Sequence, residues 1–267
     1  MTAQLTAPTA GTTSSPYRLS FARVVRSESI KLLTLRSTWW SLGITAVLTI
    51  GIALMIAGAS RGFEGGYPAV MAIVSPMQFT MLVAGILGAI AITGEYSTGM
   101  IRSTFAAVPS RGTVLLAKAL VVAVVLAVTT LLTSVIAVAA TAPIVSDSPI
   151  DWADAAQSTI PLLMSILAMV TFAFIGLGFG FLIRNGAGAI AATVGLLFVL
   201  PIVFNMFVMA GDGWQWIVEA GKYLPMSGAQ VATAPGGDDV LRGALTLVAW
   251  PAALLVGAWG VLRTRDA

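Results

Sequence analysis

Six long apolar stretches constrain the fold of this 267-residue chain more than any other feature. Each approaches or exceeds the length of about 20 apolar residues that a helix needs to cross a bilayer. Only 9% of all residues are charged, against about 25% in soluble domains. The sequence therefore predicts an all-α integral membrane protein with six transmembrane helices, at about residues 39–59, 71–93, 114–140, 159–183, 187–209 and 241–262.

The segments outside these stretches divide the rest of the chain. Residues 1–19 are rich in Thr, Ala, Ser and Pro, so we expect a disordered cytoplasmic tail. Residues 20–37 have a helical apolar stripe with basic side chains around it, which predicts an amphipathic helix at the membrane interface. Residues 38–267 form the six-span domain, in which 211–239 is a long outer segment. The predicted stripe consists of Phe21, Val24, Val25, Leu32 and Leu35.

One acidic residue, Glu28, interrupts the apolar stripe of that first helix, which a simple lipid-bound helix would avoid. Its nearest local partner is Lys31, three residues on. A surface ion pair of this kind contributes at most a few tenths of a kcal/mol. This explanation stands beside a second one, contact with a partner protein, which rests on a resemblance described below.

Residues 94–112 are polar and charged although they lie between two apolar stretches, so they belong at a membrane surface. Their helical pattern places Glu95, Thr98 and Arg102 on one face and apolar side chains on the other. Pro109 ends the predicted helix, and Gly112 lets the chain turn into the next span. A plain interfacial loop helix is one interpretation; a docking surface for a cytosolic partner is the other.

Absent residues and motifs exclude several kinds of chemistry. The chain has no Cys and no His, which excludes disulfides, thiol nucleophiles, Cys/His zinc sites and imidazole catalysis. It has no GxxxxGK[ST] motif for a nucleotide phosphate. No charged residue lies near the centre of a span, which argues against a proton-coupled carrier. Lys118, about one turn into the third span, is expected to extend back to the membrane surface.

The sequence of residues 94–112, GEYSTGMIRSTFAAVPSRG, closely resembles the loop after the second span of ABC type-2 transporter permeases, in particular bacterial ones. The pattern Glu28-x-x-Lys31 before the first span resembles the same family. The resemblance implies a coupling helix that docks on a separate ATPase subunit. The matching positions include Ile101, Pro109 and Lys118, and the residues expected to serve ATPase coupling are Glu28, Lys31, Glu95, Tyr96, Ser97, Thr98, Gly99, Arg102 and Arg111.

Two alternatives exist for the polar residues inside the spans, such as Thr80, Thr129 and Thr133. They either form hydrogen bonds between helices or line a cavity. In the resembled family the second and fifth spans of two subunits enclose the substrate path. The resemblance therefore implies path residues on these spans, namely Gln78, Phe79, Phe198, Phe204 and Asn205.

The resulting hypothesis is a permease subunit of an ATP-driven exporter in a bacterial plasma membrane. We expect a second copy of the chain or a homologous permease, a cytosolic ABC ATPase and membrane lipid as partners, and no nucleic acid. ATP and Mg are expected on the ATPase, with no cofactor on this chain. A membrane anchor or sensor subunit that transports nothing is the alternative, and an uncoupled channel is a third possibility.

The distribution of Lys and Arg predicts the orientation, because cytoplasmic loops are enriched in these residues. With six spans, both termini and residues 94–112 share one side, which carries eleven of the 14 basic residues. Both termini are therefore expected in the cytoplasm. The basic residues of that side are Arg18, Arg23, Arg26, Lys31, Arg36, Arg102, Arg111, Lys118, Arg184, Arg263 and Arg265.

Cysteine labelling tests this orientation, and the chain has no native Cys to interfere. A cysteine at Ser148 should react with an impermeant thiol reagent in intact cells, because residue 148 is expected outside. A cysteine at Ser110 should stay unlabelled until the cells are permeabilised. The reverse pattern would invert the orientation and remove the cytosolic docking surface.

Overall fold

The computed structural model describes residues 20–60, 67–145 and 149–264, and within these ranges the regular elements are helices, without a strand. The tail expected for residues 1–19 lies outside the described residues, as does the outer labelling site, Ser148. Six helical stretches are long and apolar enough to cross a membrane. The all-α, six-span prediction is therefore confirmed.

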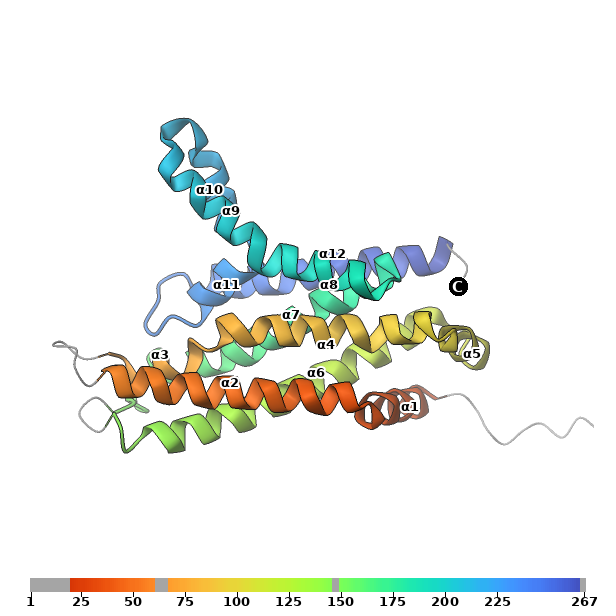
Figure 1. Ribbon diagram of the computed structural model, residues 1–267, viewed down its shortest axis with the longest axis horizontal. Helices are drawn as coiled ribbons and strands as arrows, with labels where there is room; N and C mark the ends of the chain where they lie inside the picture. The colour runs from red at the N-terminus through yellow and green to blue at the C-terminus, as the bar shows by residue number, and fades with distance from the viewer. Residues whose placement is uncertain (1–19, 61–66, 146–148, 265–267) are drawn as a thin grey trace, which may run out of the picture.

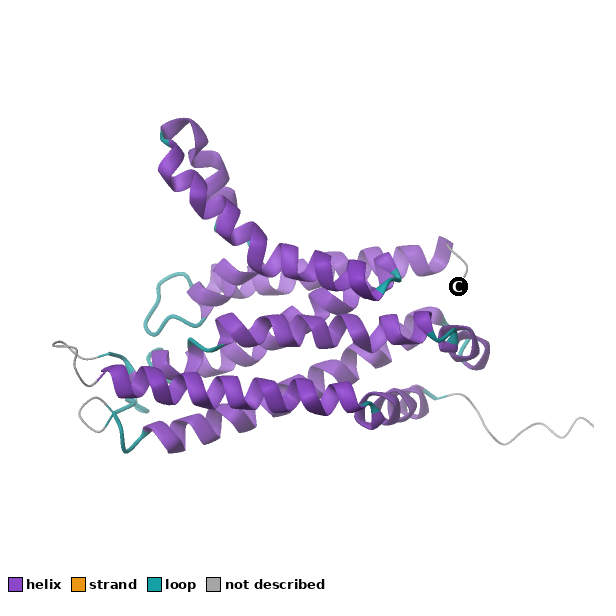
Figure 2. Cartoon of the chain, in the orientation of Figure 1, coloured by secondary structure: helices purple, strands orange, loops and turns teal. Residues whose placement is uncertain are grey.

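Five of the spans, and the first part of the fifth span of the chain, run along the long axis of one bundle (Figures 1 and 2). The helices α1 (Phe21–Thr34) and α5 (Met100–Ala107) lie at the end where α12 terminates, and we call this the α5 end. The spans are α2 (Arg36–Ser60), α3 with α4 (Ala69–Val74, Met77–Ser97), α6 (Arg111–Thr141), α7 (Thr159–Ile183), a composite fifth span beginning with α8 (Gly186–Val194), and α12 (Val240–Thr264).

The fifth span is not a regular helix along its length. After α8 the backbone forms a π-helical turn, Gly195–Val199, where the N–H of Leu200 donates to the carbonyl of Gly195. The short helix α9 (Leu200–Met206) follows, and its Pro201 has no N–H to donate. With α10 (Gln215–Gly221), α9 forms a hairpin that projects away from the bundle, and α11 (Pro225–Ala232) returns the chain to α12 (Figure 1).

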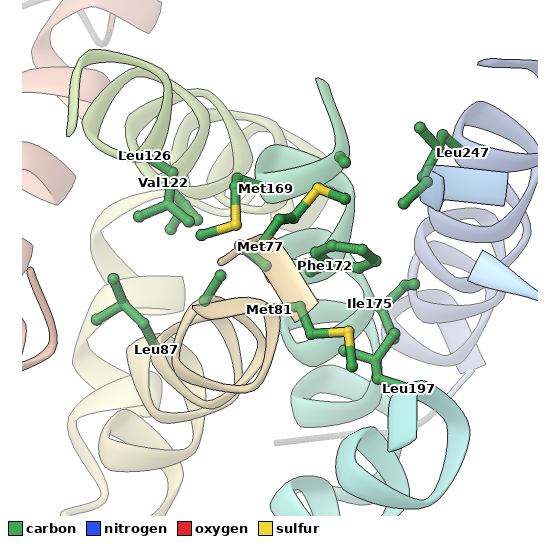
Figure 3. Close-up of a cluster of buried hydrophobic side chains, with 14 of the residues drawn as sticks. Met77, Met81, Leu87, Val122, Leu126, Met169, Phe172, Ile175, Leu197 and Leu247 are labelled. Atoms are coloured by element: carbon green, nitrogen blue, oxygen red, sulfur yellow. The ribbon is translucent and has the colours of Figure 1, made fainter. Parts of the chain in front are cut away.

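Glycine allows α4 and α7 to approach so closely that their backbones touch. A Cβ atom at Gly176 would overlap the carbonyl oxygen of Gly85, and one at Gly88 would overlap that of Ala173. This confirms that the small residues of the fourth span permit close helix approach. Phe172 of α7 is fully buried beside this contact, in a core shared with α6, the π-helical turn after α8, and α12 (Figure 3).

The polar side chains inside the spans mostly bond to their own helix. The hydroxyl of Thr129 donates to the carbonyl of Val125 at 2.8 Å, and that of Thr133 to Thr129 at 2.9 Å. The first alternative, a hydrogen bond donated to another helix, is therefore wrong for these two residues. Such a bond does exist elsewhere, because Thr171 of α7 donates to the carbonyl of Leu247 in α12 at 2.9 Å.

The contact between α4 and α7 predicts the effect of a single methyl group. The substitution Gly176→Ala should lower the free energy of unfolding by about 1–3 kcal/mol, because overpacking forces the two helices apart. Gly51→Ala in α2 is the matched control, since a Cβ atom there has nothing within 4 Å. Thermal unfolding of the purified variants in detergent measures both. Equal melting temperatures for the two variants would contradict the close contact.

Candidate functional site

The first helix, α1, is fixed against the bundle by its buried stripe. Ser20 begins it, because its hydroxyl oxygen accepts a bond from the N–H of Arg23 at 3.4 Å. Val24, Glu28 and Leu32 are buried, one helical turn apart, and α1 contacts α6. Phe21 and Leu35, which were expected in the same stripe, are exposed. The buried face of α1 is therefore narrower than the apolar pattern, and it includes the acidic Glu28.

The chain breaks between α4 and α5, because Gly99 has a positive φ of 71°. A left-handed residue at this point suits glycine, which lacks a Cβ. The prediction that one helix carries Glu95 and Arg102 on a shared outward face is therefore wrong. Glu95 lies in the last turn of α4 and is buried, whereas Arg102 lies on α5 and is exposed.

The apolar side of α5 rests on the protein itself. Ile101 is buried in a cluster with Leu115 of α6 and Phe181 of α7. The helix ends at Ala107, with Val108 as its C-cap, before Pro109 as expected. Gly112 does not make the following turn, because α6 already begins at Arg111.

The buried Glu95 belongs to a group of four charged side chains, Glu28, Lys31, Glu95 and Lys118, which we call the ion-pair cluster. The ammonium of Lys118 lies 2.5 Å from Oε2 of Glu28 and 2.6 Å from Oε1 of Glu95. It also donates to the carbonyl of Ala91 at 3.2 Å. All three N–H donors of Lys118 therefore have acceptors, and they join α1, α4 and α6.

Lys31 contacts both carboxylates of the cluster and also α5. Its ammonium lies 2.7 Å from Oε1 of Glu28 and 3.3 Å from Oε1 of Glu95. It donates to the hydroxyl of Thr104 at 3.0 Å, and this hydroxyl donates to Oε2 of Glu95 at 3.1 Å. Thr104 thereby connects α5 to the cluster, a role that nothing in the sequence pattern indicates.

Burial determines what these contacts do. The side chains of Glu28, Glu95 and Lys118 are 2%, 4% and 6% exposed, against 23% for Lys31. The surface-pair explanation of Glu28 is therefore wrong, and Lys118 does not extend back to the membrane surface. Removing water from such charges is costly, and the structure offsets the cost because each carboxylate contacts both ammonium groups.

The other residues expected to serve ATPase coupling divide into two groups. Ser97, Thr98 and Gly99 are exposed beside Arg102. Tyr96 is half-buried and lies under the guanidinium of Arg184, 5.4 Å from the ring centroid. Arg111 makes contacts within the chain: its guanidinium donates to the carbonyl of Leu262 at 2.7 Å and lies over the ring of Phe105.

The expected path residues do not line one cavity within the chain. Phe79 and Phe198 are 55% and 40% exposed, and Gln78 is exposed beside Phe79. Phe204 and Asn205 line a separate hollow of about 260 Å³, with walls from α9, α10, α11 and α12 rather than α4. The amide of Asn205 donates to the carbonyl of Pro201, within its own helix.

The helices and the site together define a polytopic membrane protein with no nucleotide-binding fold in its described residues. Residues 53–223 match the family described as ABC-2 family transporter protein, which is more than half of the chain. The chain belongs to this ABC-2 transporter family and is a membrane permease. Glu95 and Lys118 lie within the matched range, and Glu28 and Lys31 precede it. A comparison with the curated proteins gave no match.

The ion-pair cluster predicts a large effect of removing its central cation. Lys118→Met leaves two buried carboxylates with Lys31 alone, and the free energy of unfolding should fall by about 3–5 kcal/mol. The matched control is Lys222→Met, which breaks the exposed pair with Glu219 and should cost below about 1 kcal/mol. Thermal unfolding in detergent compares the two. Equal losses would show that the cluster contributes no more than a surface pair.

Proposed function

We propose that this permease is the membrane subunit of an ATP-driven exporter, in which two copies form the path and two copies of a separate ATPase dock at α5. The observation that carries the proposal is the ion-pair cluster. It fastens α1 and α5, at the surface of the α5 end, to the ends of α4 and α6. A displacement of α5 by the ATPase would therefore act directly on two spans.

The exposed and buried residues have different parts in this proposal. Ser97, Thr98, Gly99 and Arg102 form an exposed surface at the α5 end, suited to direct contact with the ATPase. Glu28 and Glu95 are buried, so they act inside the permease, by holding the docking helix to the spans. With the basic residues marking the cytoplasmic side, the α5 end faces the cytosol, where ATP is available.

A path between two copies of the chain is supported by the outward position of the expected path residues. Phe79 and Phe198 are more than a third exposed, and Gln78, next to Phe79 on α4, is exposed as well. An amide facing lipid is costly because nothing there satisfies its hydrogen bonds. A second copy against these residues would cover the aromatic rings and place the amides beside an enclosed path.

ATP hydrolysis belongs to the partner in this proposal. Permeases of this family generally pair with ATPase subunits, and this sequence has no phosphate-binding loop. ATP and Mg would therefore bind to the ATPase. The purified permease alone should show no ATP turnover.

Arg102 tests the docking surface, because it is exposed and outside the ion-pair cluster. Arg102→Glu should leave expression and melting temperature unchanged but weaken binding of the ATPase by roughly 2–5 kcal/mol, the cost of breaking a desolvated charge pair at an interface. Pull-down of the co-expressed ATPase and cargo flux in vesicles measure the two consequences. Asp151→Ala, at an exposed residue of the loop before α7, is the control and should change neither.

The two readouts separate the exporter from a membrane anchor. An anchor loses ATPase binding in the variant but shows no ATP-dependent flux even in the wild-type complex. Normal ATPase binding and flux in the Arg102→Glu variant would overturn docking at α5.

A further inference from the structure

A hollow of about 480 Å³ adjoins the ion-pair cluster, between α1, α4 and α6. Its volume is within the range of small-molecule sites, about 300–1,000 Å³. Most of its wall is apolar, with Leu32 from α1, Leu35 directly after it, Ile90 from α4, and Val121 and Val122 from α6. The hollow can therefore enclose the apolar body of a small molecule.

The ion-pair cluster supplies the charged side of this hollow. All four of its members, Glu28, Lys31, Glu95 and Lys118, line the wall. The two ammonium groups differ in how firmly they are held. Lys118 is 6% exposed and lies 2.6 Å from Glu95, whereas Lys31 is 23% exposed and lies 3.3 Å from it. Lys31 is therefore the member that can leave at the lower cost.

Space for that movement exists on the other side of Lys31. A second hollow of about 390 Å³ lies between α1 and α5, and Glu28 and Lys31 line both hollows. Met100 of α5 also lines both hollows. If the ammonium of Lys31 turns out to water, Glu28 and Glu95 keep only Lys118, and the cluster has one net negative charge facing an apolar hollow.

We propose that the larger hollow binds apolar organic cations, whose positive charge replaces that of the Lys31 ammonium beside Glu28 and Glu95. The apolar body of the ligand lies against Leu32, Ile90 and Val121. An anion in this place would face two carboxylates, and a neutral molecule would leave a buried charge unbalanced. Charge complementarity thus selects monovalent cations over anions of equal size.

The meaning of this site for transport rests on the proposed function, in which such cations would be cargo or regulators of the exporter. Binding itself does not require the ATPase. It can therefore be measured on the purified full-length permease, and its failure would leave ATP-driven export of another cargo intact. Loss of export in the complex, conversely, would leave the binding result standing.

Tetraphenylphosphonium and tetraphenylborate are matched probes, because they have nearly the same size and shape and opposite charges. Equilibrium binding of radiolabelled tetraphenylphosphonium to the permease in a neutral detergent should be saturable. Excess unlabelled tetraphenylphosphonium should displace the label, and tetraphenylborate should not. Empty micelles give the background for both ions.

Two substitutions of charged residues change binding in opposite directions. Lys31→Met removes the tethered competitor, so the affinity for tetraphenylphosphonium should rise about tenfold or more. Glu95→Gln removes half of the anionic site, so the affinity should fall about tenfold or more. A general loss of folding cannot produce tighter binding, so the rise in the Lys31 variant is the decisive result.

A third variant keeps the proposal testable if the charged variants do not fold. Leu35 is 45% exposed and lines the hollow, so Leu35→Trp fills the hollow from a position where bulk is tolerated. It should abolish saturable binding without changing the melting temperature. Saturable binding unaffected by Leu35→Trp would overturn the proposal. Equal binding of the two probes, no saturable binding to the wild type, or weaker binding to a folded Lys31→Met variant would do the same.

Discussion

The structure at the α5 end depends on one ammonium group, that of Lys118. Its three donors reach Glu28, Glu95 and the carbonyl of Ala91, so a single side chain of α6 holds both α1 and the end of α4. Without it, α1 would keep its narrow apolar stripe and the contacts of Lys31 with Glu95 and Thr104. The amphipathic helix that composition places at the membrane surface is in this way made part of the transmembrane domain.

The contacts between helices are of two kinds, and we expect them to differ in stiffness. The contact between α4 and α7 is made by backbone on backbone, with glycines at the crossing, and it leaves no room for adjustment. The contacts of α1 and α5 with the spans include long, charged side chains, of which Lys31 is partly exposed. Motion at the α5 end is therefore expected in α1 and α5, while α4 and α7 move together.

The six spans could be predicted because an apolar stretch of this length has few other stable environments, and the small residues of α7 indicated its close packing. The ion-pair cluster could not be predicted from helical periodicity. Gly99 changes the direction of the chain, so Glu95 and Arg102 do not share a face, and the partner of Glu95 lies on another span. A usable signal was present: Glu28 and Lys118 each interrupt an apolar pattern with opposite charges. Pairing such interruptions would have indicated the cluster, although not the part of Thr104.

The π-helical turn of the fifth span has a consequence for the two halves of that span. A π turn accommodates one additional residue, and one residue corresponds to about 100° of rotation in an α-helix. Before the turn, Ala189 and Thr193 are buried; after it, Ile202 and Met206 are exposed. Pro201, after the turn, is buried as well, so the additional residue sets which side of each half faces the bundle. Deleting one residue of the turn would rotate the whole α9–α10 hairpin relative to the bundle, so the register of this segment sets the direction in which the hairpin points.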